Sequence, residues 1–189
     1  MLSDEQKANT LLLRGFSKHR GYPSMEERYG LKAFSIATYP MYRGLTRLLG
    51  FTVHMGASTI EEEFKVLNEN YAGYDFFYLH IKQTDSRGED GDFDGKVKVI
   101  EAVDKLIPEL TKLDPDVLVV TGDHSTPAAL KGHSWHPLPV LLYSDCCRPD
   151  EVKRFDEISC IQGGMGRMRS IHLMHVALAN AGRLAKYGA

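Results

Sequence analysis

Carboxylate and imidazole side chains suited to binding divalent metal ions gather in short segments of this sequence. Asp123 and His124 are adjacent, His133 follows them, and Asp85 and Glu89 lie upstream. Carboxylate oxygens and imidazole nitrogens together suit Zn²⁺ or Mn²⁺. These residues therefore predict a site for two divalent ions.

Local structure offers an alternative interpretation of some of the same residues. Asp123 and His124 alone suit a helix cap or a turn as well as a metal site. Asp90, Asp92 and Asp94 are expected to solvate a loop or begin the next helix, because acidic residues favour helix N-termini. His80 lies within a predicted strand, so a hydrogen-bonded histidine in the core or the wall of the site is the favoured interpretation.

Basic residues near these segments are candidates for binding an anion. Lys82 follows His80 by two positions and is expected on the same face of the strand, at its ligand end. Arg43 and Arg14 are each followed by glycine, so each guanidinium could clamp a phosphate or carboxylate while the backbone stays close. A surface role is equally compatible with either arginine.

The elements that must position these residues alternate along the chain. Short apolar runs rich in β-branched and aromatic residues predict strands, and longer segments with helical spacing separate them. This order predicts an α/β fold with a largely parallel sheet and helices on both faces, forming one domain over residues 1–189. Ligands bind at the carboxyl ends of the strands in such sheets. The expected strands are Lys32–Thr38, Asp75–Ile81, Val117–Thr121 and Val140–Tyr143, and the expected helices are Tyr42–Leu49, Ile60–Asn70, Gly95–Leu113 and His172–Lys186.

Length and charge exclude several classes of protein. A chain of 189 residues with 43% hydrophobic and 25% charged residues fits one folded domain. The net charge of -2 provides no positive field for a nucleic acid or an anionic membrane, and no apolar run is long enough to span a bilayer. The three cysteines form no disulfide framework and the N-terminus does not resemble a secretory signal, so we expect a cytoplasmic location.

Several segments of the chain, in order, resemble the archaeal-type cofactor-independent phosphoglycerate mutases, also called 2,3-bisphosphoglycerate-independent. That family belongs to the alkaline phosphatase superfamily, and this chain resembles its C-terminal half. The segments are Leu11–Gly15, Tyr39–Gly44, His80–Asp85, Gly122–Pro127 and Lys186–Ala189.

The resemblance implies a glycolytic enzyme that interconverts 3-phosphoglycerate and 2-phosphoglycerate through a phosphoserine, with two metal ions and no organic cofactor. It implies that Asp85, Glu89 and His133 bind one ion, Mn²⁺ or Zn²⁺. Asp123 and His124 would bind the second, together with an aspartate and the nucleophilic serine of the family's N-terminal portion. In related mutases a histidine often stands at the position of Glu89. A carboxylate in place of an imidazole can change which metal ion the site prefers.

No serine of this sequence matches the context of the family's nucleophile, so we expect the chain alone to lack mutase activity. A complementary N-terminal chain or self-association is then expected, because the sheet would lack a neighbouring strand. Two other functions remain open. The chain could belong to another metal-dependent phosphohydrolase of the superfamily, or it could be a non-catalytic assembly module.

Overall fold

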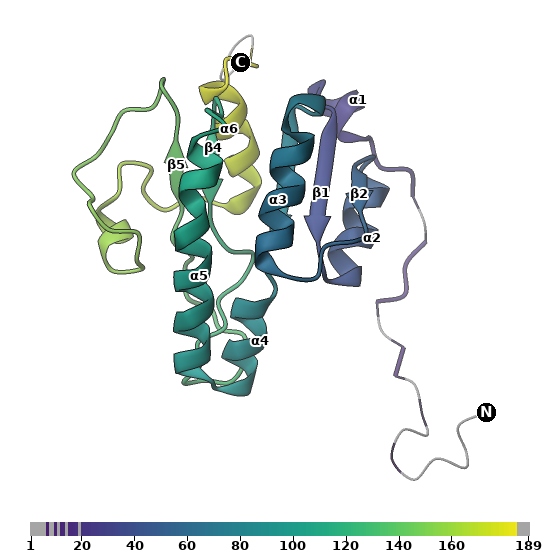
Figure 1. The fold of residues 1–189 in the computed structure, drawn as a ribbon, viewed down its shortest axis with the longest axis vertical. Helices are drawn as coiled ribbons and strands as arrows, with labels where there is room; N and C mark the ends of the chain where they lie inside the picture. Colours follow the sequence, from purple (N-terminus) through teal and green to yellow (C-terminus); the bar gives the residue numbers. More distant parts are fainter. Residues whose placement is uncertain (1–6, 8–9, 11, 14, 19, 185–189) are drawn as a thin grey trace.

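The computed structural model describes residues 7, 10, 12–13, 15–18 and 20–184, and Figure 1 shows their arrangement. Arg14 and the segment Lys186–Ala189 lie outside the described residues. The helices are α1 (Met25–Tyr29), α2 (Pro40–Leu48), α3 (Ile60–Asn70), α4 (Gln83–Asp90), α5 (Phe93–Thr111) and α6 (Leu173–Asn180), with 3₁₀ turns at Tyr71–Gly73, Ser159–Gln162 and Ser170–His172. The strands are β1 (Ala33–Ala37), β2 (Thr52–His54), β3 (Phe76–His80), β4 (Leu118–Val120) and β5 (Leu141–Tyr143).

A parallel sheet of three strands in the order β2-β1-β3 forms the centre of the fold. The middle strand, β1, is buried at every position. Side chains alternate between the two faces of a strand, so Phe34 and Ile36 pack with Leu67 of α3, which runs alongside β1 in Figure 1. Ala33 packs on the other face with Leu178 of α6. The predicted α/β sheet with helices on both faces is therefore confirmed.

Local sequence signals explain where the helices begin and end. The predicted start of α3 is confirmed, because the Thr59 side chain accepts a hydrogen bond from the Glu62 backbone N–H and the Glu62 carboxylate accepts one from the Thr59 backbone N–H. Gln83–Asp90 forms α4, although no helix was expected between the strand ending at Ile81 and the helix beginning at Gly95. Gly91 ends this helix with a φ of 74°, a left-handed conformation that glycine adopts without strain.

The strands β4 and β5 were expected to belong to the parallel sheet, but they lie outside it. They form a separate antiparallel pair, with Val119 opposite Leu142. Parallel neighbours need a crossover connection that is usually helical. The segment 121–140 contains no helix and doubles back on itself, so β5 returns antiparallel to β4.

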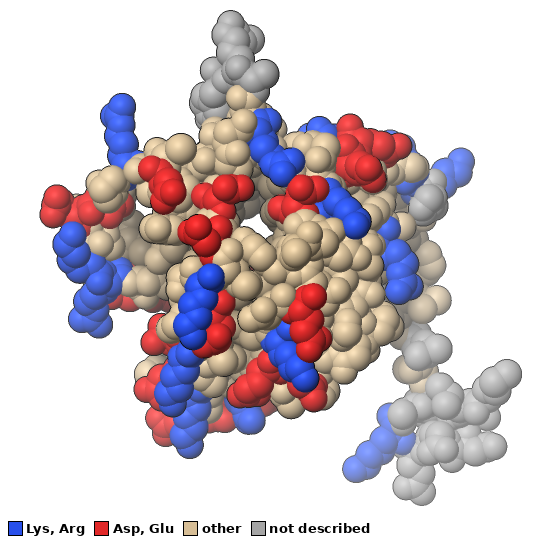
Figure 2. All heavy atoms as spheres, turned by 45° about the horizontal axis from the view of Figure 1, so that its top comes forward, with Lys and Arg blue, Asp and Glu red and all other residues tan. Residues whose placement is uncertain are grey.

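Other differences are small. The sequence pattern missed the short elements α1 and β2, and α6 ends at Asn180, earlier than expected. Ile100 of α5, one of the apolar residues at helical spacing, is 52% exposed. Among the described residues, no helix combines the length and the apolar character needed to cross a membrane. Acidic and basic side chains are interspersed on the face drawn in Figure 2.

Candidate metal centre

The predicted metal ligands come from two segments, each of which follows a strand. Asp85 and Glu89 lie four residues apart on α4, directly after β3, so they share one face of the helix. The second segment follows β4 and carries the other predicted ligands. An antiparallel bridge between Ser125 and Ser134 folds it back on itself, with the Ser134 N–H donating to the Ser125 carbonyl at 2.8 Å.

This fold-back brings two histidines together. The rings of His124 and His133 lie with their centroids 3.9 Å apart. His133 Nε2 is 3.8 Å from Asp85 Oδ1 and 3.7 Å from Glu89 Oε1. His124 Nε2 lies 3.6 Å from Asp123 Oδ2. The structure thus brings all the predicted metal ligands into one neighbourhood.

Three of these residues form the tightest group. Ligand atoms of Asp85, His124 and His133 all lie within 4.8 Å of one another. One carboxylate and two imidazoles are a donor set that Zn²⁺ and Mn²⁺ accept. These residues therefore fit a divalent metal ion.

Close packing holds the two segments against each other. Gly88 of α4 is buried against Thr126, and a Cβ added there would meet the Thr126 carbonyl oxygen and lie 3.0 Å from its Cγ2. Lys96 Nζ of α5 donates to the same carbonyl oxygen at 2.7 Å. The Thr126 hydroxyl donates to Asp85 Oδ1 at 2.5 Å. A larger residue at position 88 would push α4 away from the histidines.

Hydrogen bonds keep Asp85 in its ionised form. Burial favours the neutral carboxyl, but hydrogen bonds from Lys82 and Thr126 and the charge of Lys82 outweigh it, so the pKa of Asp85 is lowered. Burial also opposes the charge of Lys82, yet its hydrogen bond and ion pair with Asp85 leave the Lys82 pKa raised. An ionised carboxylate is the form that binds a cation.

Two of the three predicted anion-binding residues, Lys82 and Arg43, lie at the same edge of the sheet. Lys82 precedes α4, and its ammonium contacts Asp85 and sits 4.9 Å from the centre of the Tyr39 ring. Arg43 of α2 donates its Nε to the carbonyl oxygen of Ala37, at the end of β1, at 2.5 Å. Arg14, the third predicted residue, lies outside the described residues.

Two residues of the site were not predicted. Tyr42 donates its hydroxyl hydrogen to Asp123 Oδ2, and its ring packs at a tilt against that of His80 with ring centroids 4.1 Å apart. Thr126 connects Asp85 with His124. Tyr42 directly precedes Arg43, and Thr126 follows His124 by two positions. Their proximity to predicted residues, within segments that carry the family resemblance, was a signal that could have found them.

The wall position predicted for His80 agrees with its partial burial and its packing on Tyr42. Its predicted hydrogen bonding is wrong for Nδ1, which is buried without a hydrogen-bond partner in the described part of the chain. Burial lowers the pKa of His80, with the charge of Lys82 acting in the same direction. A neutral aromatic ring therefore packs beside the site.

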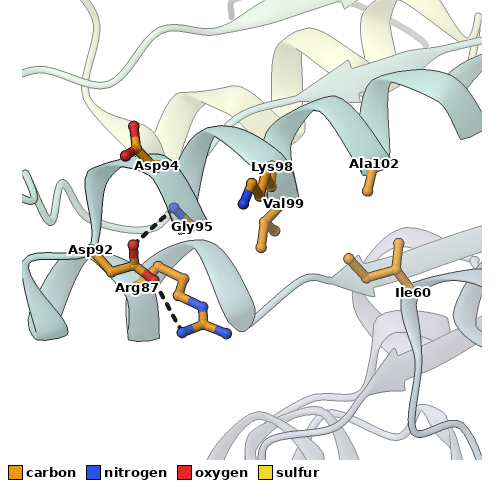
Figure 3. Close-up of a pocket in the computed structure, with 8 residues that line it drawn as sticks. All are labelled: Ile60, Arg87, Asp92, Asp94, Gly95, Lys98, Val99 and Ala102. Carbon is orange, nitrogen blue, oxygen red and sulfur yellow. Dashed lines mark hydrogen bonds and ion pairs between the residues drawn. The ribbon is translucent and has the colours of Figure 1, made fainter.

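An open pocket of about 340 Å³ lies away from the metal ligands, where α5 begins (Figure 3). None of its lining residues is a predicted site residue. Asp92 lines it and caps α5, accepting a hydrogen bond from the Gly95 backbone at 2.9 Å and pairing with Arg87 at 3.1 Å. The expectation that Asp92 begins a helix is thereby confirmed.

Carboxylates and imidazoles that converge after β3 and β4 of an α/β fold are typical of a metal-dependent enzyme. The model of the metalloenzyme superfamily matches residues 8–180, so the chain belongs to that superfamily. This result confirms the class that the fold and the site define.

Individual relatives carry a more specific name. The chain is 53% identical over 189 residues to a probable 2,3-bisphosphoglycerate-independent phosphoglycerate mutase of Thermosipho melanesiensis, and 50% identical over 192 residues to one of Thermus thermophilus. Both alignments cover all of this chain and 47% of the relative. The chain thus spans about half the length of the curated relatives it matches, and the predicted resemblance to these mutases is confirmed.

Solved structures agree with the fold. A Pyrococcus horikoshii protein superimposes with a TM-score of 0.84 at 31% identity, over 88% of this chain and 54% of that one. A cofactor-independent phosphoglycerate mutase from Thermoplasma acidophilum superimposes with a TM-score of 0.68 at 27% identity, over 85% of this chain and 40% of its own length.

Proposed function

We propose that this chain forms the metal-binding part of a 2,3-bisphosphoglycerate-independent phosphoglycerate mutase, which interconverts 3-phosphoglycerate and 2-phosphoglycerate in the cytoplasm. The observation that carries the proposal is the convergence of Asp85, His124 and His133 within 4.8 Å. The names of the relatives support the reaction, and the superfamily supports the use of metal.

The site residues then take distinct roles. Asp85, Glu89 and His133 hold one divalent ion, and Asp123 and His124 contribute to a second. When bound, the two ions neutralise phosphate oxygens and lower the pKa of an attacking hydroxyl.

The remaining roles belong to the anion-binding side chains and to a further segment. Arg43 and Lys82 orient the phosphate and carboxylate of the substrate, and Arg14 assists from the N-terminal segment. The serine nucleophile and the remaining metal ligands come from a complementary segment outside residues 1–189, which together with this chain forms one phosphatase-like domain.

Metal titration tests the proposed site. Calorimetric titration with Zn²⁺ or Mn²⁺ should show binding to the 189-residue chain, and Asp85→Asn and His133→Ala should each weaken it at least tenfold. Asp94→Asn is the matched control, because Asp94 is an exposed acidic residue outside the group. Absence of binding, together with unchanged stability of His133→Ala, would favour the non-catalytic module.

Complementation tests the reaction. The chain alone is expected to leave 3-phosphoglycerate unchanged in the presence of metal. Mixed with the missing half of a full-length relative, it should form 2-phosphoglycerate. Mutase turnover by the chain alone would contradict the assignment of the serine to another segment. Hydrolysis of an aryl phosphate by the mixture, without mutase activity, would favour the phosphohydrolase.

Sedimentation of the chain alone measures whether it self-associates.

A further inference from the structure

The hydroxyl of Thr126 contacts two of the proposed metal ligands, Asp85 and His124. Thr126 is only 3% exposed. Its Oγ1 lies 2.5 Å from Asp85 Oδ1 and 3.0 Å from His124 Nδ1. Asp85 and Thr126 are 41 positions apart in the sequence, so this contact exists only in the folded chain.

The direction of the two hydrogen bonds follows from a count of hydrogens. A threonine hydroxyl has a single hydrogen to donate, and an ionised carboxylate can only accept. The Thr126 hydrogen therefore points to Asp85. The contact to His124 is then a hydrogen bond only if the imidazole donates, which requires the ring hydrogen on Nδ1.

This tautomer decides which nitrogen of His124 is free. With the hydrogen on Nδ1, the lone pair of the neutral ring is on Nε2. Nε2 is the nitrogen that lies 3.6 Å from Asp123 Oδ2. The free nitrogen and the Asp123 carboxylate thus lie together on the side of the ring away from Thr126.

We infer that Thr126 is a positioning residue that holds His124 in its Nδ1–H tautomer. Nε2 of His124 is then free to bind one metal ion beside Asp123, while Asp85 binds the other ion. The inference rests on the proposed function, which supplies the metal site, and it adds a role for the hydrogen bonds of Thr126. Partners of this kind orient metal-binding histidines, and their loss lowers metal affinity by about 10- to 100-fold.

The backbone of Thr126 is held independently of its hydroxyl. Its carbonyl oxygen accepts the hydrogen bond from Lys96, and its backbone and Cγ2 pack on Gly88. Thr126→Val keeps the shape of the side chain and removes only the hydroxyl. Thr126→Ser keeps the hydroxyl and removes the methyl group, so it is the matched control.

The tautomer can be measured without metal. Long-range ¹H–¹⁵N correlation spectra of the chain labelled with ¹⁵N-histidine distinguish the nitrogen that carries the hydrogen, and His124→Gln identifies the signals of His124. We expect the Nδ1–H pattern in the wild type and in Thr126→Ser, and its loss in Thr126→Val. An Nε2–H pattern in the wild type would overturn the inference without any variant. So would an unchanged pattern in Thr126→Val, or an equal loss in Thr126→Ser.

Metal binding gives the second readout. Thr126→Val should bind Zn²⁺ about 10- to 100-fold more weakly than the wild type, and Thr126→Ser should stay close to the wild type. Equal affinities for the wild type and Thr126→Val would overturn the positioning role. If the wild type binds no Zn²⁺, the proposed function fails, whereas the tautomer of the metal-free chain still decides the role of Thr126.

Discussion

Glu63 on the first turn of α3 should make the stability of this protein depend on pH. Its side chain is 0% exposed, and neither carboxylate oxygen has a hydrogen-bond partner among the described residues. Burial raises its pKa from 4.5 to about 7, although the charge of Arg43 opposes the shift. The folded chain therefore retains this proton over a range in which the unfolded chain has released it.

The sign and size of the effect follow from this difference. Between pH 4.5 and 7 the folded state binds more protons at Glu63, so the free energy of unfolding falls as the pH rises. A pKa difference of about 2.5 corresponds to about 3 kcal/mol of stability, lost in full only well above pH 7. About 2.5 kcal/mol of this loss develops between pH 5 and pH 8.

Glu63→Gln removes the titration and keeps the size of the side chain. Urea unfolding at pH 5 and pH 8 should show that the wild type loses about 2.5 kcal/mol more than the variant over this interval. With a slope of about 2 kcal/mol per M urea, the difference is about 1 M in midpoint. Any constant cost of the buried amide cancels in the comparison between the two pH values.

Glu61→Gln is the control, because Glu61 is an exposed residue of the same helical turn. It should keep the pH dependence of the wild type. If Glu63→Gln also kept it, a carboxyl buried without partners would not be the source, and the reasoning from its burial would be refuted.

Three further substitutions test individual contacts of the fold, and the free energy of unfolding in urea is measured for each. Gly88→Ala should destabilise the chain by about 2 kcal/mol and weaken Zn²⁺ binding, because the added methyl group meets the Thr126 carbonyl oxygen. Gly44→Ala is the control, because nothing lies within 4 Å of the added Cβ, and it should neither destabilise the chain nor weaken Zn²⁺ binding. Thr59→Ala removes the cap of α3 and should cost about 1 kcal/mol; a loss below the measurement error would contradict the capping role. Asp75→Asn should also cost about 1 kcal/mol at pH 7, because the backbone N–H of Lys32 bonds to this carboxylate. A hydrogen bond from the Lys32 backbone lowers the pKa of Asp75, so this cost should shrink as the pH falls and the wild-type carboxyl protonates.

Much of the fold could be predicted because its signals are local. The apolar run around β1 and the start of α3 at Ile60 depend only on neighbours in the sequence, and both lie where they were expected. The helix α4 was missed because its sequence, with Gly88 and several polar residues, has a low intrinsic helix propensity. Packing of Gly88 on Thr126 and the Gly91 cap stabilise it, and the first of these contacts is long-range.

The sequence by itself determined which side chains are present to bind metal and that each group follows a strand. Asp85, Asp123 and His124 could be selected because carboxylates and imidazoles after buried strands are local features. Only the tertiary structure decided how they are supported. The hydrogen bond from Tyr42 to Asp123 spans 81 positions, and the one from Thr126 to Asp85 spans 41. Such contacts depend on how separate segments pack, and no local propensity or periodicity encodes the distance between two atoms so far apart along the chain.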